Sequence, residues 1–207
     1  MRYESLIFDI DGTLWDSRAV IAEGYNAQLE KEGLSQLAVN ADTFLPLFGK
    51  VMTDIADIIF PSVPVPERYA LMNRCMDAGD RHLQENPCRI GYPGILETME
   101  QLAKTHRLFI VSNSQKGYPE LCMEKLGLTG LIQGHLCFGE TGTNKGATIR
   151  TLMETYHVTD CAYVGDTQLD CEATQEAGIS FIWASYGFGT PDRYDYKIDS
   201  FADLLSL

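Results

Sequence analysis

The chain has 207 residues, of which 45% are hydrophobic and 22% are charged, a composition typical of globular proteins. Its formal net charge of −13 argues against a nucleic acid as a partner, because phosphate backbones bind surfaces rich in Lys and Arg. An anionic substrate stays possible, since a divalent cation can invert the local field of an acidic site.

The cysteines and the apolar runs indicate the cellular compartment of the protein. None of the six cysteines forms a C-x-x-C pair, and most have apolar neighbours, which is typical of free thiols in a protein core. The apolar run near the N-terminus is too short for a signal peptide, and no later run approaches the length of a transmembrane helix. We therefore expect a cytoplasmic protein without a membrane partner.

Short apolar runs predict strands that are covered on both faces. Each run is rich in β-branched or aromatic residues and lacks a clear alternation of apolar and polar positions. The four clear runs are residues 6–8, 108–111, 162–164 and 179–183, and residues 131–139 are a weaker candidate.

Between the later strands, the apolar residues recur with helical spacing. Gly127 and Gly178 end two of these stretches, as glycine often does at a helix C-terminus. Strands that alternate with helices predict an α/β fold, a Rossmann-like parallel sheet with helices on both faces. The predicted helices fall within residues 94–106, 118–128, 145–158 and 168–179.

Residues 17–86 break this alternation, because they contain only helical candidates. A block of about 70 residues is far longer than an ordinary connection between a strand and a helix. We therefore expect an all-α domain at 17–86, inserted after the first strand of a core that comprises 1–16 and 87–207. The helical candidates lie at residues 17–33, 41–49, 50–60 and 65–85.

Polar side chains follow three of the predicted strands at the point where each strand ends. Because active sites of open parallel sheets lie at the carboxyl ends of the strands, we expect these side chains to converge. A lysine that opens the helix before the third of these strands is expected to join them. The set comprises Asp9, Asp11, Ser112, Asn113, Lys145, Asp166 and Asp170.

These residue types fit phosphoryl transfer. Carboxylates are hard ligands that suit Mg²⁺, and an aspartate can attack a phosphoryl group to form an aspartyl-phosphate. A second carboxylic acid can protonate the leaving oxygen and then activate the water that opens the intermediate. A hydroxyl, a lysine and the N–H groups of a helix N-terminus can hold the phosphate oxygens.

The motifs "DIDGTLWDS", "VSNS", Lys145 and "GDTQLD", in this order, resemble the four signature motifs of the haloacid dehalogenase (HAD) superfamily. The similarity spans the whole chain and is greatest to members of the phosphoglycolate phosphatase and β-phosphoglucomutase type. The helical insert resembles the small cap of that family.

The resemblance implies a role for each matched residue. Asp9 is expected to be the nucleophile, and Asp11 the general acid and base, which also offers its backbone carbonyl to Mg²⁺. Ser112 is expected to bind the phosphate, Lys145 to stabilise charge, and Asp170 to support both the metal and the lysine. The predicted metal ligands are Asp9, Asp11, Asp166 and Asp170.

Several assignments have alternatives. Lys145 is not followed by the proline that is frequent in the family, which leaves Lys116 as the other candidate lysine. Ser112 and Asn113 are expected to bind the phosphate or to cap a helix, and the two roles are compatible because the same N–H groups serve both. Lys50 either contacts the substrate from the insert or is a solvated lysine.

Other residues are expected to have structural roles only. Gly187 and Gly189 lack the rest of a dinucleotide-binding motif and are expected to lie in turns. Trp15 is expected to pack in the interior.

The sequence therefore predicts a Mg²⁺-dependent phosphatase that hydrolyses a small phosphomonoester through an aspartyl-phosphate. The alternatives are a sugar-phosphate mutase similar to β-phosphoglucomutase and a catalytically idle binding protein with the same fold. A dehalogenase is disfavoured, because Asp11 has no task when no leaving oxygen needs a proton. The expected partner is a small phosphorylated metabolite, with no nucleic acid, and the expected state is a monomer or a weak homodimer.

Overall fold

The computed structural model describes residues 3–87 and 90–207, and the chain divides into two compact units. One unit comprises Met1–Asp16 and Gly91–Leu207, and we call it the sheet unit. The other comprises Ser17–Ile90, and we call it the helical unit.

The sheet unit contains a parallel sheet with the strand order β3-β2-β1-β4-β5-β6. The predicted α/β, Rossmann-like fold class is therefore confirmed. The short edge strand β6 was not predicted, because it has only three residues and its first two are exposed. The strands are β1 (Ser5–Phe8), β2 (Arg107–Ser112), β3 (Ile132–Cys137), β4 (Cys161–Gly165), β5 (Ser180–Ala184) and β6 (Tyr196–Ile198).

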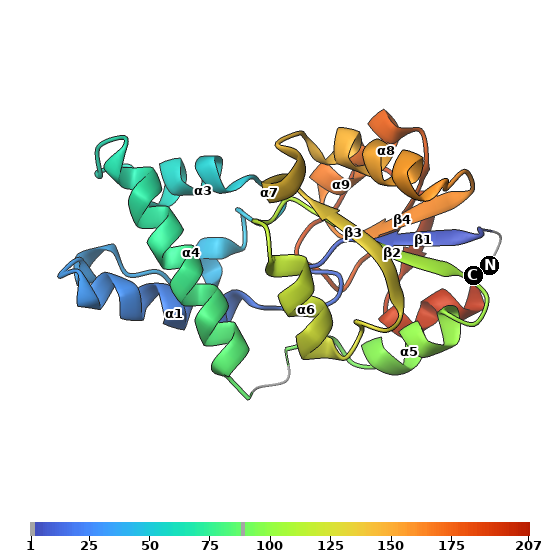
Figure 1. Ribbon diagram of the computed structural model, residues 1–207, viewed down its shortest axis with the longest axis horizontal. Helices are drawn as coiled ribbons and strands as arrows, with labels where there is room; N and C mark the ends of the chain where they lie inside the picture. Colours follow the sequence, from blue (N-terminus) through green and yellow to red (C-terminus); the bar gives the residue numbers. More distant parts are fainter. Residues whose placement is uncertain (1–2, 88–89) are drawn as a thin grey trace. The chain divides into compact units, whose positions relative to one another are not determined.

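Helices cover both faces of this sheet (Figure 1). Alternate strand residues such as Ile7 and Phe109 pack with α8 and α9 in one core cluster. Phe8 points to the opposite face, where its ring lies 5.8 Å from that of Phe201. Burial on both faces explains why β1 and β4 read as continuous apolar runs. The helices of this unit are α5 (Ile95–Leu102), α6 (Tyr118–Leu126), α7 (Phe138–Thr141), α8 (Lys145–Tyr156), α9 (Gln168–Ala177) and the 3-10 helix η2 (Phe201–Ser206).

The described residues of the helical unit form helices and loops only. The predicted helix at 41–49 is shorter than expected, because α2 ends at Phe44, two residues before Pro46. The elements of this unit are α1 (Arg18–Lys31), η1 (Ser35–Leu37), α2 (Ala41–Phe44), α3 (Met52–Ile59) and α4 (Glu67–Glu85).

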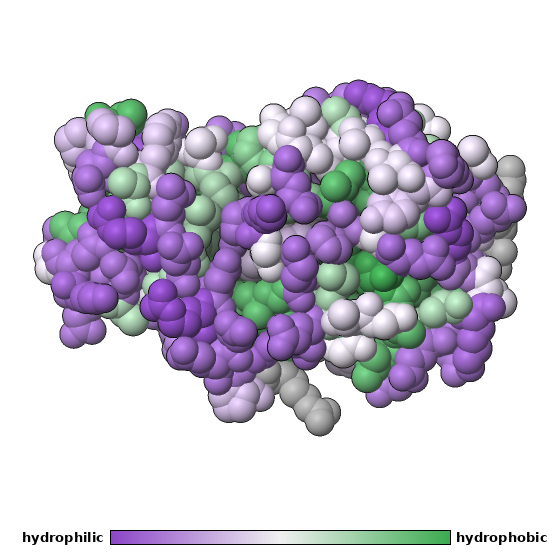
Figure 2. All heavy atoms as spheres, viewed as in Figure 1, coloured by the Kyte–Doolittle hydropathy of each residue, from purple (hydrophilic) through white to green (hydrophobic). Residues whose placement is uncertain are grey.

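The surface in view is covered mainly by hydrophilic residues, with small separated hydrophobic patches (Figure 2). Within the described ranges, every helix is too short or too polar to cross a membrane. The five cysteines at described positions are free and buried, and Cys88 lies outside the described residues.

Helices α1 and α4 cross closely at two glycines. A Cβ atom on Gly24 would lie 2.7 Å from the Cα of Gly79 and 2.8 Å from the carbonyl oxygen of Ala78. Because both neighbours are backbone atoms of a packed helix, they cannot move aside at low cost.

We expect Gly24→Ala to lower the free energy of unfolding by about 1–2 kcal/mol, because the overpacking outweighs the better helix propensity of alanine. Urea denaturation followed by circular dichroism measures this change. Glu30→Ala, at an exposed position of the same helix, is the control and should stay within about 0.5 kcal/mol of wild type. An unchanged or increased stability of Gly24→Ala would show that the crossing tolerates a side chain.

Candidate active site

The carboxyl ends of three adjacent strands bring the predicted polar residues together. Asp9 follows β1, Ser112 ends β2 and Asp166 follows β4. The Asp9 N–H donates to the Val164 carbonyl at 2.9 Å, so the β1–β4 ladder continues to the carboxyl edge of the sheet. The side chains of Asp9 and Asp166 are buried, with residue exposures of 4% and 0%.

Lys145 connects two of the carboxylates. Its Nζ donates to Asp9 Oδ1 at 2.9 Å and to Asp170 Oδ1 at 2.6 Å. Burial opposes the charge of this lysine, but Asp170 and Asp9 outweigh that effect and hold its pKa above the usual value. Lys116 is exposed, so the geometry favours Lys145 as the lysine of the site.

The ring of Tyr163 also contacts the lysine, with its centroid 5.7 Å from Lys145 Nζ. The Tyr163 hydroxyl donates to the Val111 carbonyl at 2.7 Å, which fixes the ring in the sheet. Tyr163 therefore supports Lys145 from β4, a contact that the sequence does not reveal.

Asp170 is held by hydrogen bonds on both carboxylate oxygens. Oδ1 accepts from Lys145, and Oδ2 accepts from the Thr167 N–H at 2.9 Å and the Thr167 hydroxyl at 2.7 Å. The bond from the Thr167 N–H, together with the bond from the Asp170 N–H to the Thr167 hydroxyl, forms the capping box of α9. The contacts fit a residue that holds the lysine, and direct coordination of a metal by Asp170 stays a prediction.

Asp166 has one carboxylate oxygen available for a cation. Its Oδ2 accepts from the Phe188 N–H at 2.7 Å, whereas its buried Oδ1 has no hydrogen-bond partner. Leaving a buried carboxylate oxygen unpaired costs free energy that a cation would remove. Asp9, Asp166 and Asp170 each offer an oxygen within 4.8 Å of the others.

The electrostatics of this cluster also fit a hard divalent cation. Burial raises the pKa of Asp9 to about 7, with Lys145 lowering it and Asp170 raising it further. Burial, followed by the charges of Asp170 and Asp9, raises the pKa of Asp166 well above its usual range. An added divalent cation would favour the ionised form of both carboxyl groups.

The loop after β5 closes around Asp166, although the sequence suggested only turn glycines there. A Cβ atom on Gly187 would lie 2.4 Å from Asp166 Cβ and 2.4 Å from the Gly12 carbonyl oxygen. The Tyr186 hydroxyl donates to the Thr13 carbonyl at 2.9 Å. In the sequence, this close approach was indicated only by Gly187 and Gly189, which come shortly after the predicted strand at 179–183.

Asp11 lies in the turn that follows β1. Gly12 has a φ of +82°, and the N–H groups of Thr13 and Leu14 donate to the Ile10 carbonyl. Asp11 Oδ1 accepts hydrogen bonds from Trp15 Nε1 and from the Tyr118 hydroxyl, each at 2.9 Å. Trp15 is buried as expected, and it also makes a polar contact with a predicted catalytic residue.

The predicted phosphate-binding residues differ in their surroundings. Ser112 Oγ is buried and accepts from the Ser114 N–H at 3.2 Å. Asn113 is half-buried, and it does not cap α6, because Gly117 occupies the N-cap position. Lys50 lies in the helical unit between α2 and α3, and its contact with a substrate stays a prediction.

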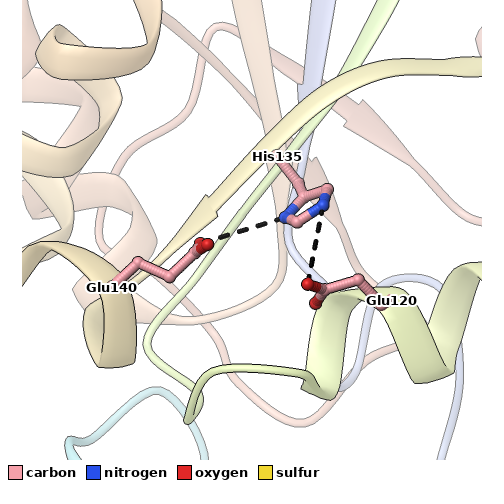
Figure 3. Close-up of side chains that lie close together, drawn as sticks. All are labelled: Glu120, His135 and Glu140. Atoms are coloured by element: carbon pink, nitrogen blue, oxygen red, sulfur yellow. Dashed lines mark ion pairs between the residues drawn. The ribbon is translucent and has the colours of Figure 1, made fainter.

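A second group of potential ligands lies in the sheet unit near β3. Figure 3 shows the ring of His135 between two carboxylates, with Glu120 and Glu140 each 3.9 Å from a ring nitrogen. Glu140 Oε2 also accepts from the Cys137 N–H at 3.0 Å, which caps α7. We therefore assign the candidate cation site to the buried aspartates and not to this partly exposed group.

Comparisons with known proteins agree with this geometry. The family of haloacid dehalogenase-like hydrolases matches residues 6–184. A phosphoglycolate phosphatase of Aquifex aeolicus is 30% identical, over 98% of this chain and 95% of that protein. One of Agrobacterium fabrum is 27% identical, over 96% of this chain and 89% of that protein.

A solved structure from Haemophilus somnus, described as a predicted phosphoglycolate phosphatase, shares the fold. It superposes with a TM-score of 0.86 and 21% identity, over 100% of this chain and 98% of that one. With a family match that covers most of the chain and motifs that meet at one sheet edge, the protein belongs to the haloacid dehalogenase-like hydrolases.

Proposed function

We propose that this protein is a phosphatase that hydrolyses a small phosphomonoester, with Mg²⁺ as cofactor and an aspartyl-phosphate on Asp9 as intermediate. The observation that carries the proposal is the buried Asp9 carboxylate, which accepts a hydrogen bond from Lys145 and lies near Asp166, whose Oδ1 has no hydrogen-bond partner. The relatives named above are phosphoglycolate phosphatases, which makes phosphoglycolate the first candidate substrate.

The cation would be held by Asp9 and Asp166, together with the backbone carbonyl of Asp11, while Asp170 holds Lys145. Hard carboxylate and carbonyl oxygens suit Mg²⁺. When bound, the ion supplies positive charge that offsets the negative charge of the transferring phosphoryl group.

In the first step, an Asp9 carboxylate oxygen attacks the phosphorus atom, and the bond to the leaving oxygen breaks. The Asp11 carboxyl group donates its proton to that oxygen, so an alcohol leaves. The Lys145 ammonium group stabilises negative charge beside Asp9, and the Ser112 hydroxyl donates to a phosphoryl oxygen.

In the second step, the Asp11 carboxylate takes a proton from a water molecule, and that water attacks the phosphorus atom of the aspartyl-phosphate. The bond between Asp9 and phosphorus breaks, which releases inorganic phosphate. Asp9 then returns to its carboxylate form, and Asp11 again carries a proton.

The relatives reported above favour hydrolysis over the mutase and over an idle binding protein. We assign residues 17–86 the role of a cap domain, which restricts substrates to small molecules and excludes water. Lys50 is the residue of this domain for which a substrate contact is proposed.

We expect Mg²⁺ to raise the melting temperature of the wild-type protein at pH 8, where Asp9 is ionised. At a concentration roughly tenfold above Kd, the shift should be about 3–6 °C for a chain of this size. Asp166→Asn should lose most of this shift, because it removes a charged ligand whose Oδ1 is unpartnered.

Asp160→Asn, an exposed substitution next to β4, is the matched control and should keep the full shift. Differential scanning fluorimetry with and without Mg²⁺ measures all three proteins. A full shift in Asp166→Asn would place the cation elsewhere.

A screen of phosphate esters with Mg²⁺ tests the activity itself. Phosphoglycolate, hexose phosphates and nucleotides are incubated with the protein, and released phosphate is measured. At least one small ester should be hydrolysed, and Asp9→Asn should lower the rate by about a thousandfold or more while the fold is retained. Near-wild-type activity of folded Asp9→Asn, or no hydrolysis of any ester, would contradict the proposal.

A further inference from the structure

Two aromatic side chains donate hydrogen bonds to the same oxygen of Asp11. The indole Nε1 of Trp15 and the hydroxyl of Tyr118 each lie 2.9 Å from Asp11 Oδ1. Trp15 is 0% exposed, Tyr118 3% and Asp11 9%, so these bonds form away from bulk water. Hydrogen bonds to a carboxylate are strongest in such surroundings.

We propose that Trp15 and Tyr118 are positioning residues that fix the Asp11 carboxyl group for proton transfer. Because both hydrogen bonds are made to Oδ1, they fix the rotation of the carboxyl group and therefore the direction of Oδ2. The pair therefore decides which oxygen of Asp11 faces the leaving group. This inference rests on the proposed function, because it assigns a task to the general acid of that reaction.

Backbone bridges to Asp11 and to Gly91 hold Trp15 in place. Its carbonyl accepts from the Gly12 N–H at 2.9 Å, and it forms an antiparallel bridge with Gly91. Next to this bridge, the Tyr92 N–H donates to the Leu14 carbonyl at 3.1 Å. The indole therefore projects from a segment that is paired with the segment at Gly91 and Tyr92.

Tyr118 is held by its helix and by its contact with Trp15. It is the first residue of α6, and Pro119 follows it in the first turn of that helix. Its ring packs edge-to-face against Trp15, with centroids 5.5 Å apart. Such aromatic pairs are favourable beyond their buried area, so the two donors support each other.

A purely structural role and a positioning role predict different kinetics. Protonation of the leaving oxygen matters for an alkyl ester, whose alkoxide is a poor leaving group, and matters little for p-nitrophenyl phosphate. The ratio kcat/KM reports the steps up to formation of the aspartyl-phosphate. A disturbed fold would lower this ratio for both kinds of ester, whereas a misplaced acid would lower it for the alkyl ester only.

The test compares Tyr118→Phe with wild type on phosphoglycolate and on p-nitrophenyl phosphate, in the presence of Mg²⁺. We expect kcat/KM to fall by about tenfold or more for the alkyl ester and to stay within about threefold for the aryl ester. Trp15→Phe should show the same selectivity. Tyr156→Phe, which removes a tyrosine hydroxyl elsewhere in the sheet unit, is the control and should leave both ratios unchanged.

A double-mutant comparison excludes indirect effects. In an Asp11→Asn background, Tyr118→Phe should cause no further selective loss on the alkyl ester, because the acid is already absent. Equal losses on both esters, no loss on either, or a selective loss that persists in Asp11→Asn would overturn the inference and leave the phosphatase proposal standing. If wild type does not hydrolyse phosphoglycolate, the alkyl ester that the screen identifies takes its place in this test. A wild-type protein that hydrolyses no ester of that screen would refute the phosphatase proposal, and this inference with it.

Discussion

The salt bridges of Lys145 are the interaction on which the rest of the site depends. One buried ammonium group joins Asp9, after β1, to Asp170, in the first turn of α9, and Asp166 lies beside them. Buried charges are costly unless they are paired, and breaking such a pair leaves an uncompensated charge in the interior. When all three carboxyl groups are ionised, their charge exceeds that of the one ammonium group, and a divalent cation would balance the difference.

The two aspartates of the first motif lie in different environments, although one residue separates them. Asp9 is surrounded by charged groups, and burial raises its pKa to about 7. Asp11 lies in the turn that follows β1 and receives hydrogen bonds from an indole and a phenol. The different partners therefore distinguish a carboxylate suited to a metal and a nucleophilic attack from one suited to proton transfer.

The parts that were predictable are those with a local signal. The buried runs at β1, β2, β4 and β5 and the polar residues after them indicated the parallel sheet and the cluster of polar side chains at its carboxyl edge. Contacts between distant segments gave no such signal: Tyr118 lies 107 positions from Asp11, and Phe188 supplies a backbone N–H that any residue other than proline could offer. The three-residue β6 and the short α7 are too brief to show a period.

The central claim is that the phosphoryl group is transferred to Asp9 before it is released. Trapping this aspartyl-phosphate intermediate tests the claim most directly. Asp11→Asn should still react with p-nitrophenyl phosphate, which needs little help from an acid, but should hydrolyse the aspartyl-phosphate slowly. Borohydride reduction of the acid-quenched protein, followed by peptide mass spectrometry, should then find homoserine in place of Asp9. Turnover without modification of Asp9, or with the modification on another residue, would contradict the account.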